Sequence, residues 1–198
     1  MFAPRLILVI DPAFDDERTD AAIDAVARAI APSLFAVQLR EKQASPLRRR
    51  ARALGLRRLT RDLGVGLIVN GDAALALEVA ADGLHLPSSS PAVPTFPWLS
   101  VAAHEDADVA GACAAGAQAA LVSPIFATPG KGTPRGVSAI ARVRQLPLAV
   151  YALGGVDASN ARACAEAGAY GVAVIRALLA SSHAGEVAKV ICESLVVS

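Results

Sequence analysis

Short apolar runs recur along the whole chain, and a more polar stretch separates each run from the next. Most of these runs are continuously apolar rather than alternating. That pattern is typical of strands that are covered on both faces, as in a parallel sheet. We predict eight strands, at residues 6–10, 34–39, 66–69, 83–86, 99–103, 119–122, 148–153 and 171–174.

The stretches between most of these runs have the spacing of amphipathic helices. In 19–31, residues Ala22, Ile23, Val26 and Ile30 recur at helical intervals. Helices are also predicted at 106–115, 138–145 and 157–167, the last capped by Asp157 and ended by Gly168. Repeated strand–helix alternation predicts a single-domain (β/α)8 TIM barrel over residues 1–198. A doubly wound open sheet is the alternative, but no Gly-x-Gly-x-x-Gly follows the first run.

Composition excludes several classes of protein. The chain has 54% hydrophobic residues, yet no apolar run nears the ~18 residues of a membrane span. Residues 1–11 lack the long hydrophobic region of a signal peptide and are predicted to hold the first strand. A net charge of +1 gives no general attraction to nucleic acid or membrane. We expect a soluble cytoplasmic protein with three buried free thiols, Cys113, Cys164 and Cys192.

Residues 47–61 are rich in arginine, which raises the alternative of a nucleic-acid partner. This segment has no aromatic residue among its arginines, however. Leu47, Leu54, Leu56 and Leu59 are spaced to form the buried stripe of a helix. The arginines are then expected on the solvated side, and we expect no nucleic-acid partner.

Gly154 and Gly155 lie between the run 148–153 and the helix that Asp157 is expected to open. Glycine adopts positive φ readily and lets backbone N–H groups approach a ligand. A helix N-terminus after such a turn binds anions, and the loops after strands 7 and 8 of a (β/α)8 barrel often hold a substrate phosphate. The pattern therefore predicts a phosphate site, with an ordinary tight turn as the alternative.

Four motifs follow four of the predicted strands in order. They are Gln38-Leu-Arg-Glu-Lys42, Ile68-Val-Asn-Gly-Asp72, Pro124-Ile-Phe-Ala-Thr-Pro-Gly-Lys131 and the Gly154-Gly155 turn. In this combination the chain resembles the thiamine phosphate synthase/TenI superfamily over nearly its whole length. The synthases join a pyrimidine pyrophosphate to a thiazole phosphate, with Mg²⁺ at the departing pyrophosphate. The resemblance implies thiamin biosynthesis with these two compounds as partners, and it is compatible with a homo-oligomer.

The resemblance also implies roles for single residues. Arg40, Lys42, Asn70, Thr128 and Lys131 match the synthase positions that hold pyrophosphate. Gln38 matches a position near the organic substrates, while Gly155, with Gly154 beside it, and Ile175 match backbone positions that hold the thiazole phosphate. Lys131 and Gln38 are thereby candidates for catalysis, with Lys131 in a loop that a ligand would order as a lid.

Some of these assignments have a plainer alternative. Arg40 and Lys42 could be surface charges on either side of Glu41, although two cations at the end of a buried strand are costly without an anion nearby. Asn70 and the glycine after it could form an ordinary turn. Arg135 could be a second phosphate clamp or a solvated side chain.

The metal ligands of the synthases are missing at the matching positions. Those enzymes hold Mg²⁺ with two carboxylates, and this chain has Gly71 and Ser90 there. A hard cation prefers carboxylate oxygens, so we expect Mg²⁺ to bind weakly or not at all. Asp72 is one residue late, which turns its side chain to the other side of a strand end, although a loop could partly compensate.

Other segments resemble the TenI branch, namely His85-Leu-Pro-Ser-Ser-Ser90, Lys131-Gly132 and Arg135-Gly-Val137. Its characterised members aromatise a thiazole carboxylate phosphate by moving a proton, without Mg²⁺, which requires a general acid or base. That branch uses a histidine where this chain has Ser123-Pro124. His85 and His104 are the histidines in reach of the catalytic face, and a hydrogen-bonded core residue is the alternative for His85. His183 falls in the terminal helical region and is assigned no role.

Three classes of function stay open. The first is a thiamin-pathway enzyme, either a synthase (a transferase) or a thiazole tautomerase (an isomerase). The second is a non-catalytic binder or regulator that keeps the phosphate site. The third is an unrelated phosphosugar isomerase. It is disfavoured because Asp11 offers an acid/base group at one strand end, while the run 148–153 offers only Tyr151.

Overall fold

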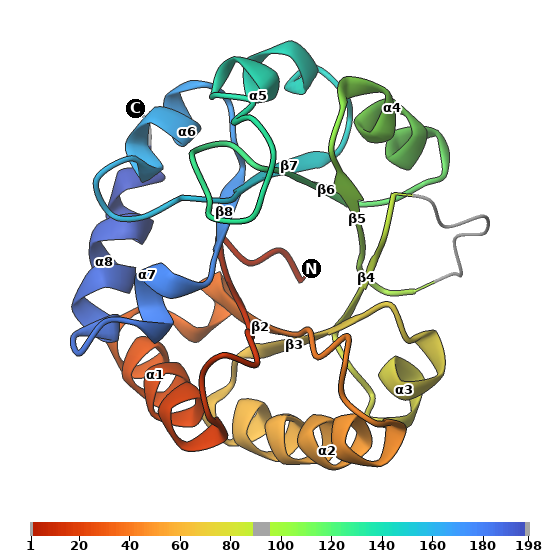
Figure 1. The fold of residues 1–198 in the computed structure, drawn as a ribbon, viewed down its shortest axis with the longest axis vertical. Helices are drawn as coiled ribbons and strands as arrows, with labels where there is room; N and C mark the ends of the chain where they lie inside the picture. Colours follow the sequence, from red (N-terminus) through yellow and green to blue (C-terminus); the bar gives the residue numbers. More distant parts are fainter. Residues whose placement is uncertain (1, 89–95, 197–198) are drawn as a thin grey trace.

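The protein forms a closed barrel of eight parallel strands in the computed structural model, which describes residues 2–88 and 96–196 (Figure 1). The strands pair in chain order, and the last returns to pair with the first. They are β1 Leu6–Val9, β2 Phe35–Leu39, β3 Gly66–Asn70, β4 Gly83–Leu86, β5 Leu99–Ala103, β6 Ala119–Val122, β7 Ala149–Leu153 and β8 Gly171–Val174. The predicted (β/α)8 barrel is confirmed, and its closure excludes the open doubly wound sheet.

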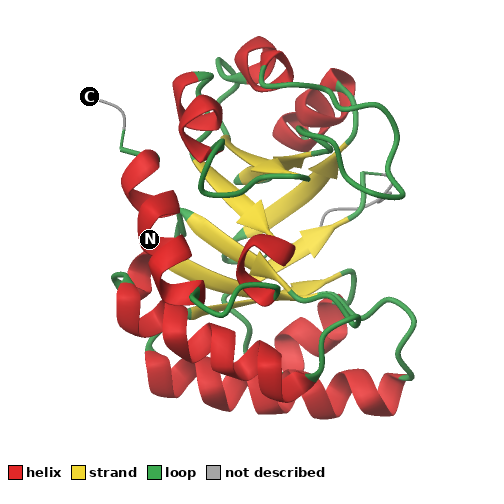
Figure 2. Cartoon of the chain, turned by 60° about the vertical axis from the view of Figure 1, so that its left-hand side comes forward, coloured by secondary structure: helices red, strands yellow, loops and turns green. Residues whose placement is uncertain are grey.

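Helices lie outside the strands and surround them as a second layer (Figure 2). They are α1 Asp16–Ala29, α2 Pro46–Leu63, α3 Ala73–Glu78, α4 Asp106–Ala114, α5 Ser138–Val143, α6 Ala161–Glu166, α7 Arg176–Leu179 and α8 Ala184–Ser194. A short 3-10 helix, η1 Pro32–Leu34, precedes β2. Within the described part of the chain, no helix has both the length and the apolar character needed to cross a membrane.

The strands bury both faces, one against the helices and the other inside the barrel. In β1, Leu6 and Leu8 pack in the outer core, whereas Ile7 and Val9 pack in the inner one. All four side chains are at most 1% exposed. This two-sided burial explains the continuous apolar runs, because a strand with no solvent face has no place for alternating polar residues.

Aromatic rings fill the amino-terminal end of the barrel. Phe2 contacts Trp98, Trp98 contacts Tyr151, and Tyr151 contacts Tyr170, all edge to face, with ring centroids 5.5, 6.1 and 5.6 Å apart. Trp98 and Tyr170 each stand directly before a strand. The N-terminal segment runs into the middle of the ring of strands, as Figure 1 shows. The barrel is therefore closed at this end and can accept a ligand only from the other.

Glycines at the start of three strands leave the room that these rings need. A Cβ added at Gly66 would lie 2.2 Å from a ring atom of Phe2, and one at Gly83 or Gly171 would lie 2.7 Å from Trp98 or Tyr151. Such distances are far below van der Waals contact, so any larger residue would displace a ring.

Two predicted helices begin elsewhere in the structure. Helix α1 begins at Asp16 rather than at residue 19, because Asp15 caps it by accepting a hydrogen bond from Arg18 N at 2.7 Å. Helix α6 begins at Ala161, so the prediction that Asp157 opens it is wrong. The Asp157 carboxylate instead accepts from the N–H and hydroxyl of Ser159 at 2.8 and 2.6 Å, which holds a turn ahead of the helix.

Helix α2 carries the arginine-rich segment, and its buried face differs from the predicted one. Leu56 is fully buried, but Leu47 is 79% exposed and does not belong to the stripe. Arg52 is only 5% exposed, which contradicts the prediction that the arginines lie on the solvated side. Its guanidinium can be buried because it pairs with Asp20 at 2.7 Å and with Asp16 at 3.2 Å, both in α1.

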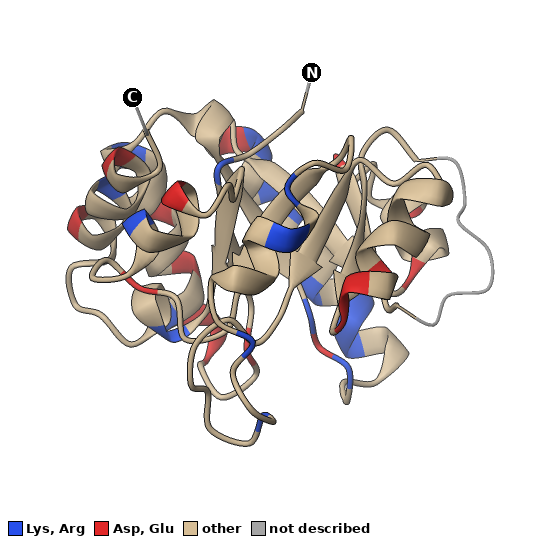
Figure 3. Ribbon diagram, turned by 90° about the horizontal axis from the view of Figure 1, so that it is seen from above, with Lys and Arg blue, Asp and Glu red and all other residues tan. Residues whose placement is uncertain are grey.

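Other arginines of α2 also pair with carboxylates of neighbouring elements. The pairs include Arg48 with Asp16, Arg50 with Glu78 and Arg57 with Asp82. Basic and acidic positions accordingly lie beside one another over the helices rather than on separate faces (Figure 3). An arginine that already holds a carboxylate attracts phosphate less, so the abundance of arginine in this helix is no argument for nucleic-acid binding.

All three cysteines are free thiols, but only Cys164 is buried, while Cys113 and Cys192 are half-buried. The prediction of three buried thiols is therefore wrong for two of them. Burial raises the pKa of Cys164 and of Cys192 to about 11, so both stay protonated at neutral pH and are poor nucleophiles.

The two leucines of α2 give a direct test of its buried face. Leu56→Ala should lower the free energy of unfolding by about 2–5 kcal/mol, because it opens a cavity in the outer core. Leu47→Ala, at an exposed position, should change it by less than about 0.5 kcal/mol. Urea denaturation followed by circular dichroism measures both. Equal losses would contradict the orientation of α2.

Candidate active site

A row of polar side chains crosses the interior of the barrel from β2 to β5. Strand pairing puts Asn70 beside His85, and His85 beside Ser100. Asn70 Nδ2 donates to Gln38 Oε1 at 3.3 Å, and His85 Nδ1 shares a hydrogen bond with Ser100 Oγ at 2.9 Å. Four neighbouring strands thus contribute one polar side chain each to an otherwise apolar interior.

One donor in this row has no partner among the described residues. Gln38 is 1% exposed, and its Nε2 makes no hydrogen bond within residues 2–88 and 96–196. A buried donor left unpaired costs roughly 1–3 kcal/mol. Gln38 therefore presents an N–H group that an acceptor on a bound molecule could satisfy.

His85 is a neutral imidazole in this setting. Burial, followed by the positive charges of Arg40, Lys42 and His104, lowers the pKa of His85 to about 3. Proton transfer is efficient when the pKa of the group lies near the working pH. The position of His85 therefore suits hydrogen bonding through a fixed ring better than it suits proton transfer.

Arg40 and Lys42 follow β2 at the carboxyl-terminal rim of the barrel. The register of β2 and β3, continued one residue, brings Arg40 level with Asn70. Both cations act on the pKa of His85, so their charges lie near that ring. Within the described residues, neither forms an ion pair. Glu41, between them in the sequence, is buried and pairs with Arg48 of α2.

The Gly154-Gly155 turn lies against the loop that follows β6. A Cβ added at Gly154 would lie 2.9 Å from Pro124 and 3.3 Å from Thr128 Oγ1, and one at Gly155 would lie 2.8 Å from Ala127 O. The two glycines have φ values of +95° and +66°. Positive φ and close approach together require glycine at both positions. Because α6 begins only at Ala161, this turn can offer an anion its own N–H groups but not a helix N-terminus.

The loop 123–137 is closed at its base and exposed at its tip. Arg135 N donates to Pro124 O at 2.8 Å, and Gly136 N donates to Ile125 O at 3.0 Å. Lys131 is exposed at the tip. Arg135 is half-buried and pairs with Asp106 of α4, so the alternative of a solvated side chain is wrong for it.

The candidate residues fall into two groups on the same rim. Continuing the register of β7 and β8 by two residues brings Gly155 level with Ile175, which stands directly before α7. One group, after β6 to β8, is Thr128, Gly154, Gly155 and Ile175. The other, in or directly after β2 to β4, is Gln38, Arg40, Lys42, Asn70 and His85. No hydrogen bond or ion pair of the Lys131 side chain links it to either group in the part of the chain that the structure describes.

The positions that match the synthase metal ligands offer little to a cation. Gly71 has no side chain, and Ser90 lies outside the described residues. The Asp72 carboxylate caps α3 by accepting from Leu75 N at 2.9 Å, and it lies 3.7 Å from Arg49 Nη1. Among residues 2–88 and 96–196, no three His, Cys, Asp or Glu side chains gather so as to hold a metal ion.

The two remaining histidines are exposed. His104 follows β5, and its Nδ1 lies 3.4 Å from Ser123 O at the end of β6. His183 stands before α8, where its Nδ1 lies 3.9 Å from Glu186. His104 is therefore on the candidate rim, and His183 is in the outer layer.

Two contacts of this site were not anticipated from the sequence. The first is the Ser100 partner of His85; a lone hydroxyl in the apolar run 99–103 was the available signal. The second is the pairing of Glu41 with Arg48 at 3.2 Å, which left no signal because any of several arginines in the segment could have taken that role. Both contacts set the orientation of a candidate residue or of its neighbour.

Comparison with known proteins identifies the family of the chain. The family model described as thiamine monophosphate synthase (TMP-TENI) matches residues 6–178. The chain belongs to this family. A thiamine-phosphate synthase of Chloroflexus aurantiacus is 36% identical over 187 residues, which cover 89% of this chain and 86% of that protein.

Two further matches differ in kind. A thiamine-phosphate synthase of Gloeobacter violaceus is 36% identical over 92% of this chain, but the match covers only 55% of that longer protein. The solved structure of a thiamine phosphate pyrophosphorylase from Pyrococcus furiosus superposes with a TM-score of 0.82 over 96% of this chain and 95% of that one. At 21% identity, that likeness concerns the fold.

Two glycines with similar backbone angles test how tightly the β7 turn is fitted. Gly71 has φ +73°, and no atom lies within 4 Å of a Cβ added there. Gly155 has φ +66°, and a Cβ added there would lie 2.8 Å from Ala127 O. Gly71→Ala should cost about 1–2 kcal/mol for the left-handed backbone alone. Gly155→Ala should cost clearly more, because the loop 123–137 must also move. Urea denaturation compares the two; equal costs would contradict the close approach.

The low pKa of His85 makes stability depend on pH. The unfolded chain takes up a proton at His85 as the pH falls below its ordinary pKa of 6.5, and the folded protein does so only near 3. Stability is therefore unaffected above about pH 6.5, and it falls by up to about 1.4 kcal/mol per pH unit between these limits. His85→Asn should flatten the dependence between pH 6.5 and 4. Parallel curves for the two proteins would contradict the assignment.

Proposed function

We propose that the protein is a thiamine-phosphate synthase, which joins a pyrimidine pyrophosphate to a thiazole phosphate at the carboxyl-terminal rim of the barrel. The observation that carries this proposal is the pair of cations, Arg40 and Lys42, without counter-ions among the described residues and beside the polar row of Gln38, Asn70 and His85. The family and the names of its relatives support the same reaction.

Arg40, Lys42 and Lys131 would stabilise the departing pyrophosphate. In this reaction the bond between the pyrimidine methylene carbon and the pyrophosphate oxygen breaks, and its electron pair leaves with the oxygen. The thiazole nitrogen then uses its lone pair to form the new carbon–nitrogen bond. Negative charge grows on the leaving group as the first bond breaks, so fixed cations at that point lower the barrier.

The polar row would orient the pyrimidine ring. Gln38 Nε2 is a buried donor without a partner among the described residues, and a ring nitrogen is an acceptor of suitable size. Asn70 holds the Gln38 amide in place by donating a hydrogen bond from Nδ2 to Gln38 Oε1. We assign His85 a neutral hydrogen-bonding role in this row, since its pKa of about 3 does not favour proton transfer.

The Gly154-Gly155 turn and Ile175 would hold the phosphate of the thiazole through backbone N–H groups. This side of the rim lies across the barrel mouth from β2 to β4, as the strand order requires. Thr128, next to Gly154, would add a hydroxyl. The two substrates would then meet over the barrel axis, with their charged ends on opposite sides.

Mg²⁺, which the family resemblance implies, does not fit the described residues well. Gly71 supplies no oxygen ligand, and the Asp72 carboxylate already accepts from Leu75 N and lies beside Arg49. We therefore assign the stabilisation of the leaving group's negative charge to the cationic side chains of the protein.

A thiazole tautomerase of the TenI kind is the second candidate. The absence of a carboxylate at Gly71 favours it, because that reaction needs no metal. His85 is a poor proton carrier here, so His104, exposed on the rim beside Ser123, would be the group to examine.

An assay of the pure protein separates these functions. Incubation with pyrimidine pyrophosphate and thiazole phosphate, with and without Mg²⁺, should yield thiamin phosphate. Conversion of thiazole tautomers without coupling would favour the second candidate. If thiazole phosphate binds by calorimetry but neither reaction occurs, the protein is a non-catalytic binder and the proposed synthase is wrong.

Lys131 tests the role of the loop tip. Lys131→Ala should lower kcat/KM by about 100-fold, the usual effect of removing one charge-stabilising donor. Thermal stability should stay unchanged because the side chain is exposed. Lys189→Ala, which removes an exposed lysine from α8, is the control and should leave kcat/KM unchanged. Equal activities would remove Lys131 from the mechanism.

A further inference from the structure

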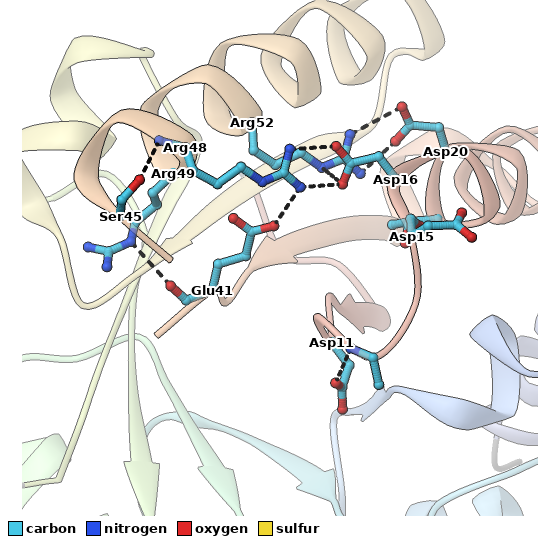
Figure 4. Close-up of polar contacts among 11 residues, drawn as sticks. Asp11, Asp15, Asp16, Asp20, Glu41, Ser45, Arg48, Arg49 and Arg52 are labelled. Carbon is cyan, nitrogen blue, oxygen red and sulfur yellow. Dashed lines mark hydrogen bonds and ion pairs between the residues drawn. The ribbon is translucent and has the colours of Figure 1, made fainter. Parts of the chain in front are cut away.

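Glu41 stands between the two cations of the candidate site, yet its side chain is held outside the barrel. It is 7% exposed, and its Oε1 accepts from Arg48 Nη2 at 3.2 Å (Figure 4). β2 ends at Leu39, and two residues later the Glu41 side chain is held against α2 by Arg48, whereas neither Arg40 nor Lys42 forms an ion pair with it among the described residues. The nearest carboxylate in sequence is thus kept away from both cations.

Arg48 is itself held in place by α1. Its Nη1 and Nη2 donate to the two carboxylate oxygens of Asp16 at 2.8 and 2.7 Å. This bidentate pair fixes the guanidinium and lowers the pKa of Asp16, chiefly through the Arg48 hydrogen bonds. Asp16 also lies 3.2 Å from Nε of the buried Arg52, which ties the pair to the middle of α2.

A second arginine fixes the backbone of the same loop. Arg49 Nε donates to the carbonyl of Glu41 at 3.3 Å (Figure 4). Its Nη2 donates to the carbonyl of Ala44 at 3.1 Å. Ala44 N in turn donates to Glu41 O at 3.2 Å, which closes a turn over residues 41–44 that includes Lys42. Side chains of α2 therefore restrain both the side chain and the main chain of Glu41.

The restraint is needed because Glu41 is an unstable neighbour. Its second oxygen, Oε2, is buried and has no hydrogen-bond partner in the described part of the chain. A buried carboxylate with one free oxygen is costly, so without Arg48 it would turn toward another cation. Arg40 and Lys42 are the adjacent residues and are free of ion pairs among the described residues.

We propose that Arg48, fixed by Asp16, sequesters the Glu41 carboxylate on the outside of the barrel and thereby keeps Arg40 and Lys42 available to an anionic group of the substrate. Arg48 is a positioning residue, since it touches no reacting atom. This inference rests on the proposed function, in which the two cations hold a pyrophosphate group.

Binding of inorganic pyrophosphate tests the inference without any turnover. By isothermal calorimetry in metal-free buffer, Arg48→Ala should weaken the affinity about tenfold, because a released carboxylate would compete for the two cations. The double variant Arg48→Ala/Glu41→Gln should return to within about threefold of the wild type, because the competitor is then neutral. Arg48→Lys, which keeps a charge beside Glu41, should stay in the same range.

Arg58→Ala is the matched control, since it removes the same charge from an exposed position of the same helix. It should leave pyrophosphate affinity unchanged. Thermal unfolding of every variant identifies any loss of fold. If Arg48→Ala binds as tightly as the control, or if the double variant stays as weak as Arg48→Ala, sequestration is wrong. A wild-type protein that does not bind pyrophosphate would overturn the proposed synthase site together with this inference.

Discussion

The interior of this barrel combines small side chains with larger aliphatic ones, and its amino-terminal end is filled by rings that come mostly from outside the strands. Ala36, Ala119 and Ala173 belong to the inner core, and alanine alone cannot fill a closed barrel to the density of a protein interior. Both tyrosines and the single tryptophan of the chain gather with Phe2 at this end. The other features of the molecule depend on that filling, because it provides the packed floor above which a polar site can be built.

Charged and polar side chains gather at the opposite, carboxyl-terminal end of the barrel. Arg40, Lys42 and the row from Gln38 to Ser100 lie at this end, and the ion pairs between α1 and α2 lie outside the strands. Glu41 joins the two, because it stands between Arg40 and Lys42 in the sequence and pairs with Arg48 of α2. The arginine-rich segment, which raised the alternative of a nucleic-acid partner, therefore contributes Arg48 and Arg49 to the contacts that hold Glu41 beside the site.

The fold class was predictable from the sequence because it follows from the regular alternation of continuous apolar runs with helical stretches along the whole chain. Helix boundaries were less so. The capping by Asp15 and the turn held by Asp157 both depend on which backbone N–H a short side chain reaches, and Asp is suited to either. The prediction that Leu47 is buried was wrong for another reason. Leu47 lies in the first turn of α2, beyond the edge of the outer core, and helical spacing alone does not show whether another element packs against that turn.

The candidate site was predictable only in part. The residues of the strand-end motifs could be named because they follow buried strands. Their charge states and partners could not, because these depend on contacts across strands and between layers. The Ser100 bond of His85 joins residues 15 positions apart, and the Arg48 pair of Asp16 joins residues 32 apart. The pKa of His85 likewise reflects burial and the cations near it, which no local pattern reveals.

The place of Trp98 has a consequence for spectroscopy. The indole is 3% exposed and is wedged between Phe2 and Tyr151, so it sits in an apolar and rigid environment. As the single tryptophan of the chain, it makes the intrinsic fluorescence a one-site signal. That signal reports whether the first residues of the chain stay seated in the barrel. A red shift and greater access to soluble quenchers would mark their detachment, even while the helices that surround the barrel remain folded.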